Sequence, residues 1–382
     1  MAIARLLATA FAGFIVFGMP PAALGVAWPS IAADLDRSLP ELGVALTVYV
    51  GGFFVSSLLT GAIVRRMGLG RALAASGAIG TLAIAGYGAS PRWWILLGAA
   101  AALGVSGAMI DAGLNAYVAL RHTTRVMALL HAGYGVGATL GPLLMTLLLG
   151  MNASWRWGYA VLAVGQAAVT ISFWRTRDRL NIERLPPDSS ARAGKVRPGL
   201  TAGLIVFLLY SGIEVGAGQW MFTLLTEARS NSDRAAGLLV TAYWAALTAG
   251  RMVLGVAGDR WSHAAMLRLA MGVVVAGLVA VWWDPTFGVG AAGIVLTGLG
   301  LSPVFPILMQ DTPGRLGASY ASTAIGYQLA SATVGAAVLP GGLGLLVAWF
   351  GLGVIPPVLV AASLAMAAVA AAGKLMAAPV AA

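Results

Sequence analysis

Residues 104–120, GVSGAMIDAGLNAYVAL, place a carboxyl group and an amide inside a long apolar stretch. Asp111 and Asn115 are four positions apart, so on a helix they lie on one face, about one turn from each other. A carboxyl group withdrawn from water favours its protonated form, which allows proton exchange near neutral pH. The amide can hydrogen-bond a hydroxyl group. The pair therefore indicates a proton site beside a polar binding site; the alternative is a structural bond to a neighbouring helix.

Glu214 is the second acidic residue inside an apolar stretch. The other Asp and Glu residues, of 13 in total, fall in loops, at segment ends or in the polar segment 175–198. A charge at membrane depth costs about 2.5–3.5 kcal/mol on insertion scales, so such residues normally face a cavity or a partner. We expect Asp111 and Glu214 to couple proton movement to function. The alternative for Glu214 is a helix–helix hydrogen bond made by its protonated form.

The composition requires lipid as the main solvent of the chain. Hydrophobic residues make up 59% and charged residues 9% of 382 residues, with a mean hydropathy of +0.88, whereas a soluble protein has about a quarter of its residues charged. The chain lacks cysteine and has three scattered histidines, so we expect no metal site. Nucleophile triads and nucleotide loops are also missing, so we expect no cofactor and no enzymatic activity. The net charge of +10 is assigned to loops rather than to nucleic-acid binding.

Apolar runs of about 20 residues predict an all-α integral membrane protein with twelve transmembrane helices. The predicted spans are 5–28, 43–64, 71–89, 93–119, 126–149, 156–174, 199–226, 235–258, 264–283, 286–309, 317–340 and 351–373. The polar segment 175–198 divides them into two six-helix bundles, 1–174 and 199–382, joined by a cytoplasmic linker. Pro303 and Pro306 are expected to bend the tenth segment.

The distribution of basic residues predicts the orientation. With both termini in the cytoplasm, most Lys and Arg residues lie on the inner side, and the outer side holds only five arginines. The outer five are Arg37, Arg92, Arg156, Arg229 and Arg234. This asymmetry follows the positive-inside rule. We therefore expect a multi-pass protein of the inner or plasma membrane, with cytoplasmic termini, acting as a monomer. Its expected partners are a small-molecule substrate, protons and the bilayer.

Two loops about half a chain apart resemble each other. GAIVRRMGLGR (61–71) follows the second predicted helix of the first half, and GVAGDRWSH (255–263) follows the second helix of the second half. Both loops resemble the signature loop of the major facilitator superfamily. The resemblance implies two pseudo-symmetric halves with a substrate path between them, and a cytoplasmic latch. Arg65 stands where the family has Asp. The implied latch residues are Gly61, Arg66, Gly68 and Arg71 in the first half and Arg251, Gly255, Asp259 and Arg260 in the second.

Within that superfamily, several stretches resemble the fucose-permease-like branch of sugar:proton symporters. The resembling stretches are IDAGLNAYV, LLHAGYGVGATLGPLL (129–144), YSGIEVGAGQW (210–220) and GLGLSPVFPILM (298–309). The resemblance implies secondary active transport of a small polar, sugar-like solute, coupled to protons by alternating access. Gly137, Gly141 and Pro142 also partly resemble a signature of drug/proton antiporters, so the alternative is efflux of hydrophobic or cationic compounds. The two glycines form a small-xxx-small pair suited to close helix packing.

Aromatic and amide side chains in the predicted helices are candidates for substrate binding, because sugars offer C–H faces and hydroxyl edges. An aromatic residue near a helix end is more often an interface anchor. An amide facing lipid would be unsatisfied, which favours the two glutamines. The candidates, besides Asn115, are Tyr134, Gln219, Trp220, Tyr243, Trp244, Tyr327 and Gln328.

Overall fold

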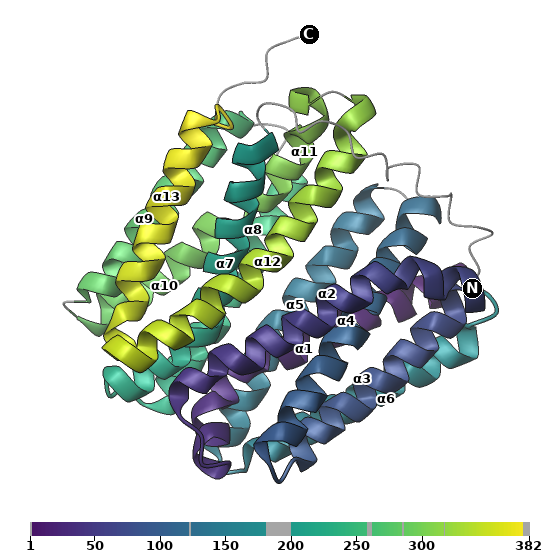
Figure 1. Ribbon diagram of the computed structural model, residues 1–382, viewed down its shortest axis with the longest axis horizontal. Helices are drawn as coiled ribbons and strands as arrows, with labels where there is room; N and C mark the ends of the chain where they lie inside the picture. Colours follow the sequence, from purple (N-terminus) through teal and green to yellow (C-terminus); the bar gives the residue numbers. More distant parts are fainter. Residues whose placement is uncertain are drawn as a thin grey trace. The chain divides into compact units, whose positions relative to one another are not determined.

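The computed structural model describes residues 2–121, 124–180, 200–257, 262–284, 286–316 and 318–376, all as helices and short connections without a strand. The long helices, drawn in Figure 1, are α1 (Ala2–Asp34), α2 (Leu42–Met67), α3 (Leu69–Ala89), α4 (Trp93–Arg121), α5 (Thr124–Gly150), α6 (Trp155–Thr176), α7 (Leu200–Thr223), α8 (Asp233–Ala257), α9 (His263–Trp283), α10 (Phe287–Leu301), α11 (Val304–Leu316), α12 (Ala318–Phe350) and α13 (Ile355–Ala372). Short turns η1 (Leu39–Glu41), η2 (Leu224–Ala228) and η4 (Leu352–Val354) flank α2, α7 and α13.

The described residues contain 12 helical stretches long and apolar enough to cross a membrane. The expected all-α fold with twelve spans is thus confirmed. The tenth span, Phe287–Leu316, consists of two helices, α10 and α11. The break falls at Ser302 and Pro303, in the stretch where Pro303 and Pro306 are expected to bend the segment, because proline has no N–H to donate and crowds the preceding turn.

The chain forms two compact units. One comprises Met1–Pro187 with Ser232–Leu238, and the other comprises Asp188–Asn231 with Leu239–Ala382. Residues 181–199, which hold most of the predicted linker, lie outside the described residues. The division into 1–174, 175–198 and 199–382 therefore stays a prediction.

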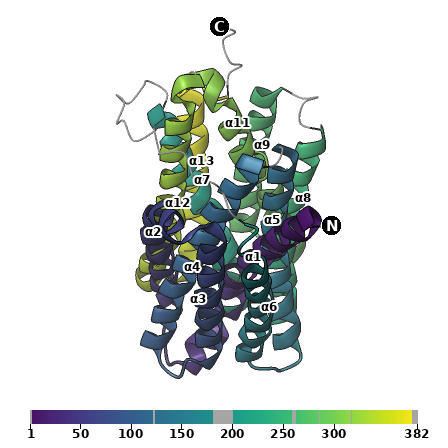
Figure 2. The same cartoon turned by 90° about the vertical axis from the view of Figure 1, so that its right-hand side faces the viewer.

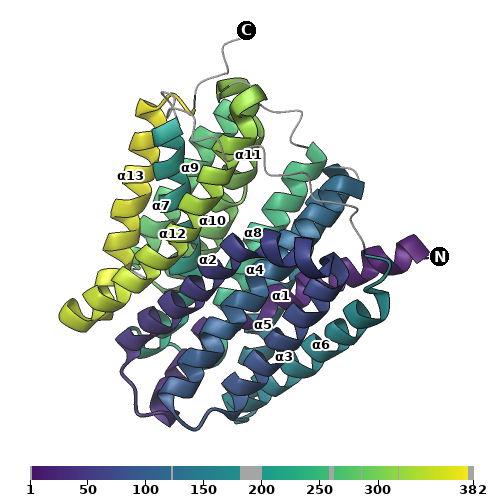
Figure 3. The ribbon, with the colours of Figure 1, turned by 45° about the vertical axis from the view of Figure 1, so that its right-hand side comes forward.

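The same order of helix packing recurs within each unit. In the first unit α1 packs along α5, and α3 packs along both α4 and α6, as Figure 2 shows for α3 and α6. In the second unit α7 packs along α12, and α9 packs along both α10 and α13, with α7, α12 and α13 adjacent in Figure 3. The membrane spans of the second unit thus pack in the same pairs as the spans six positions earlier in the first unit. This repetition is the pattern expected of two duplicated six-helix bundles.

Glycines bring the paired helices into backbone contact. A Cβ atom at Gly137 of α5 would lie 1.8 Å from the carbonyl oxygen of Ile15, and one at Gly141 would lie 2.3 Å from that of Met19. The predicted close packing at this glycine pair is confirmed. Gly335 of α12 takes the corresponding place in the second unit, where a Cβ would lie 1.9 Å from the Leu208 carbonyl oxygen of α7.

Replacing Gly335 by alanine is expected to destabilise the protein by about 1–3 kcal/mol, because α7 and α12 must separate to admit the methyl group. Gly342 on the same helix is the matched control, since a Cβ there meets nothing within 4 Å. Thermal unfolding in detergent measures both variants. Equal melting temperatures for Gly335→Ala and Gly342→Ala would contradict the contact.

Candidate functional site

The carboxyl group of Asp111 and the amide of Asn115 form a hydrogen-bonded pair on α4. The Asn115 Nδ2 donates to Asp111 Oδ1 at 2.9 Å, as the four-residue spacing predicts. The Asn115 Oδ1 is buried, and no partner for it occurs among the described residues. Ion pairs recorded in the described ranges also leave Asp111 without a cationic partner. Among the described residues, the site therefore has a carboxyl group with no ion-pair partner and a buried hydrogen-bond acceptor with no donor.

Two aromatic residues from neighbouring helices lie near this pair. Tyr49 of α2 lies close enough to both Asp111 and Tyr134 of α5 to interact with them electrostatically. The Tyr134 ring in turn lies 5.3 Å from the Phe17 ring of α1, centroid to centroid. Tyr134, a predicted binding residue, is thus in the same part of the first unit as Asp111. Tyr49 was missed because a single tyrosine in an apolar run gives no signal that separates a site residue from an interface anchor.

The second intramembrane carboxylate, Glu214 of α7, forms an ion pair. Arg251 of α8 donates from Nη2 to Glu214 Oε2 at 3.0 Å and to Oε1 at 3.2 Å. The same nitrogen lies 2.7 Å from the Tyr210 hydroxyl, and the Tyr243 hydroxyl donates to the Glu214 backbone carbonyl at 2.9 Å. The side chains of Glu214 and Arg251 are 13% and 22% exposed. Guanidinium, carboxylate and two hydroxyl groups therefore form one largely buried network in the second unit.

Arg251 makes contacts that differ from those its predicted role implies. The signature-loop resemblance assigns Arg251 to the cytoplasmic latch, whereas its guanidinium group bonds to Glu214 and Tyr210. The predicted latch role stays untested, because Asp259 and Arg260 lie outside the described residues. Gly255 lies in α8.

The first copy of the signature loop is described in full. Gly68 separates α2 from α3 with φ 81° and ψ 152°, and its N–H donates to the Val64 carbonyl group at 2.9 Å. This left-handed conformation favours glycine. Arg66 and Arg71 are exposed, and a Cβ at Gly61 would meet only Arg65 Nη1, at 3.3 Å. The loop is therefore a tight turn with exposed arginines, and its latch function stays a prediction.

The predicted aromatic residues of α7 and α8 are enclosed by protein. Trp220 is 0% exposed, and its Nε1 donates to the Pro340 carbonyl oxygen of α12 at 3.0 Å. Trp244 packs on Gly218, and its buried Nε1 has no partner among the described residues. Gln219 is buried. Trp220 thus joins α7 to α12, while Trp244 carries a polar atom available for a further partner.

The last two predicted binding residues differ in environment. Gln328 of α12 is 4% exposed, and its Oε1 accepts from the Thr312 hydroxyl group of α11 at 3.1 Å. Tyr327 is 39% exposed. The amide oxygen therefore has a donor within the protein, as expected for a glutamine that does not face lipid. Substrate binding by either residue stays a prediction.

Proteins from yeast and from Escherichia coli are similar to this chain in sequence, at low identity. The yeast Saccharomyces cerevisiae protein "Bypass of stop codon protein 6" is 24% identical over 283 residues, covering 65% of this chain and 56% of the yeast protein. This chain thus spans little more than half the length of that relative. The Escherichia coli "Uncharacterized MFS-type transporter YcaD" is 24% identical over 294 residues, covering 74% of this chain and 76% of YcaD.

Two solved structures have a similar fold. The human organic anion transporter MFSD10 (TETRAN) aligns with a TM-score of 0.69 and 14% identity over 96% of this chain and 98% of its own. A bacterial homolog of the human lysosomal transporter Spinster, in an inward-facing and occupied conformation, aligns with a TM-score of 0.70 and 12% identity over 98% and 95%. At such identities the similarity concerns the fold alone.

The family itself follows from a sequence profile. The profile of the Major Facilitator Superfamily matches residues 6–232, more than half of the chain. The fucose-permease-like branch is not distinguished by this match and stays a prediction. The twelve helical spans, the repeated packing of the two units and the profile agree. This chain is a multi-pass membrane protein that belongs to the Major Facilitator Superfamily, a family of transporters that move solutes by alternating access.

Proposed function

We propose that the protein is a proton-coupled carrier of a small polar, sugar-like solute, with Asp111 as the group that binds the transported proton. It acts as a monomer in the inner or plasma membrane, with both termini in the cytoplasm. The observation that carries the proposal is the contrast between the two intramembrane carboxyl groups. Glu214 has a guanidinium partner at 3.0 Å, whereas the recorded partner of Asp111 is the neutral amide of Asn115 at 2.9 Å.

Charge compensation explains why the proton is assigned to Asp111. A buried carboxylate paired with a cation is neutral as a pair, and its hydrogen bonds offset part of its desolvation. A carboxyl group beside a neutral amide becomes neutral by taking up a proton, since burial of an uncompensated charge is costly. Such a group exchanges protons as its access to water changes, which is what alternating access provides.

The binding of a polar solute is supported by a buried acceptor in the first unit. The Asn115 Oδ1 accepts no hydrogen bond from the described residues. Unsatisfied buried polar atoms cost about 1–3 kcal/mol each. A hydroxylated solute that donates to the Asn115 Oδ1 removes this cost, and the ring of Tyr134 in the same unit offers a face for its C–H groups.

The experiment is transport into proteoliposomes by the purified protein under an imposed pH gradient. Radiolabelled monosaccharides and polyols form one arm, and a lipophilic cation such as tetraphenylphosphonium forms the other. We expect a sugar to accumulate when the inner pH exceeds the outer pH and to equilibrate without accumulation when the gradient is collapsed. The sign follows from symport, because the proton then moves down its gradient together with the solute.

Two results would contradict the proposal. Expulsion of the lipophilic cation in exchange for protons, without sugar movement, would assign the protein to the efflux class. Accumulation of a sugar that is unchanged when the pH gradient is collapsed would retain the substrate class but reject coupling to protons.

A further inference from the structure

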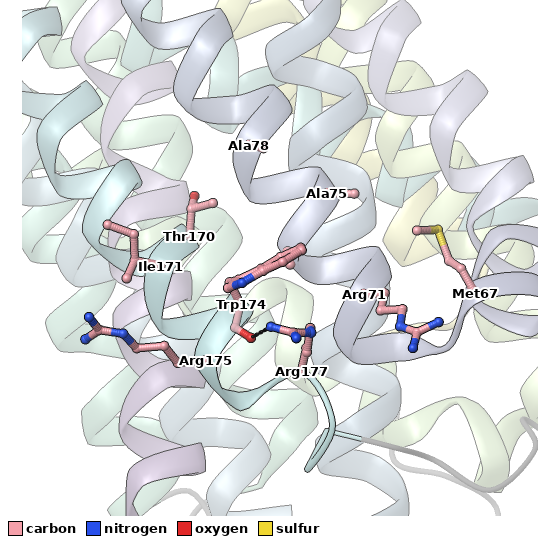
Figure 4. Close-up of a pocket in the computed structure, with 10 residues that line it drawn as sticks. Met67, Arg71, Ala75, Ala78, Thr170, Ile171, Trp174, Arg175 and Arg177 are labelled. Carbon is pink, nitrogen blue, oxygen red and sulfur yellow. Dashed lines mark hydrogen bonds between the residues drawn. The ribbon is translucent and has the colours of Figure 1, made fainter.

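A groove lies between α3 and α6 at the end of the first unit that carries both the Gly68 turn and the end of α6. Its volume is about 440 Å³. Its apolar walls include Ala75 and Ala78 of α3 and Ile171 and Trp174 of α6 (Figure 4). Ile171 is 51% and Trp174 is 59% exposed. A groove with large exposed apolar side chains on a membrane-spanning helix pair is shaped for a hydrocarbon chain.

Arginines stand at one end of this groove. Arg71 in the first turn of α3 and Arg177 just after α6 both line it, with Trp174 beside them (Figure 4). Arg177 donates from Nη1 to the Trp174 carbonyl oxygen at 2.8 Å, and its guanidinium carbon lies 4.2 Å from the centroid of the Trp174 ring. Arg71 is exposed, and no hydrogen bond or ion pair to it is recorded within the described ranges.

Among the described residues, one acidic side chain pairs with these arginines, and it compensates little of their charge. Asp178 lies 3.9 Å from the Arg177 Nε and is 75% exposed. A pair of that length and exposure contributes little. Arg175, on the far side of Trp174, adds a third positive charge to the lining. The end of the groove is therefore cationic, and complementary to a phosphate group that arginine can bind through two parallel hydrogen bonds.

A close backbone contact holds the two arginines at the same end. A Cβ atom at Gly70 would lie 1.9 Å from the Arg177 carbonyl oxygen, so the start of α3 touches the end of α6. Arg71 follows Gly70 directly. The spacing of the two guanidinium groups is therefore set by main-chain packing as well as by side-chain rotamers.

We propose that this groove binds an anionic phospholipid, with the headgroup phosphate on Arg71 and Arg177 and an acyl chain along Trp174 and Ile171. The inference depends on the proposed cytoplasmic position of the termini, and is independent of the proposed substrate and of Asp111. The cytoplasmic leaflet carries anionic lipids, and basic pockets between transmembrane helices on that side bind anionic head groups. A free phosphate ion would use the arginines but not the apolar walls.

The test is native mass spectrometry of the purified protein with equimolar phosphatidylglycerol and phosphatidylcholine of the same acyl chains. We expect phosphatidylglycerol to be retained at least tenfold more than phosphatidylcholine. Thermal shift in a neutral detergent provides the second readout, with dihexanoyl phosphatidylglycerol and inorganic phosphate as further arms. We expect stabilisation by the long-chain anionic lipid, a smaller shift with the short-chain lipid and none with phosphate.

Variants separate the headgroup contact from general charge. Arg71→Gln with Arg177→Gln is expected to reduce the preference for phosphatidylglycerol to near unity, whereas Arg92→Gln, an exposed arginine between α3 and α4, should keep it. Equal retention of both lipids by the unaltered protein would overturn the proposal, and this result does not depend on any variant folding. Stabilisation by inorganic phosphate as strong as by the lipid would replace it with an ion site. If Arg92→Gln also lost the preference for phosphatidylglycerol, the preference would come from the overall charge of the protein and not from the groove.

Discussion

Asp111→Asn is expected to abolish accumulation driven by a pH gradient while the protein stays folded and inserted. The amide is nearly isosteric with the carboxyl group and can still bond to Asn115 of α4, but it cannot take up a proton. One coupled proton lets a gradient of one pH unit support about tenfold accumulation, since a factor of ten corresponds to about 1.4 kcal/mol. The variant should therefore reach an accumulation ratio of one, measured in proteoliposomes with the labelled solute.

Solute exchange without net proton movement is the control for a binding-competent protein. Counterflow by Asp111→Asn should persist, because loading one face and unloading the other does not require a change in protonation. Asp36→Asn is the matched control substitution, since Asp36 is exposed and has a positive φ of 52°, which asparagine also adopts. Full accumulation by Asp111→Asn would transfer the proton site to another residue.

Arg251→Met is expected to cause the largest loss of stability among these substitutions, about 3–5 kcal/mol, because it leaves a buried carboxylate without its partner. Glu214→Gln leaves the guanidinium group of Arg251 uncompensated, although that group keeps the Tyr210 hydroxyl as a neighbour at 2.7 Å. The double variant Glu214→Gln with Arg251→Met should recover part of the loss. Thermal or denaturant unfolding of the four proteins in one detergent gives the coupling between the two side chains.

An exposed ion pair provides the comparison for this cycle. Arg37 and Glu41 lie 3.8 Å apart and are 36% and 29% exposed, so Arg37→Met should cost no more than about 1 kcal/mol. If the losses of stability in Glu214→Gln and Arg251→Met simply add, the two groups do not stabilise each other. The ion pair then contributes nothing to the free energy of unfolding. A coupled pair would also make Glu214 a poor candidate for the transported proton, in agreement with its assignment to Asp111.

Features that depend on local spacing were predictable from the chain. Hydrophobic runs predict the helices because a membrane span must satisfy its backbone internally and face lipid with apolar side chains. The Asp111–Asn115 bond follows from positions four apart on one helix. The close contacts of Gly137 and Gly141 follow from a small-xxx-small pattern, and the break between α10 and α11 follows from Pro303.

Contacts between different helices could not be predicted from local spacing in the sequence. Glu214 and Arg251 are 37 positions apart, and Trp220 and Pro340 are 120 apart. Whether such residues meet depends on the rotation of each helix about its axis, and this rotation is fixed by packing against neighbours, as where Gly335 touches the backbone of α7. A nearly uniform apolar surface gives little periodicity from which to read that rotation. The chain thus revealed its buried carboxyl groups, and helix packing determined that one is paired with a cation while the other bonds to an amide.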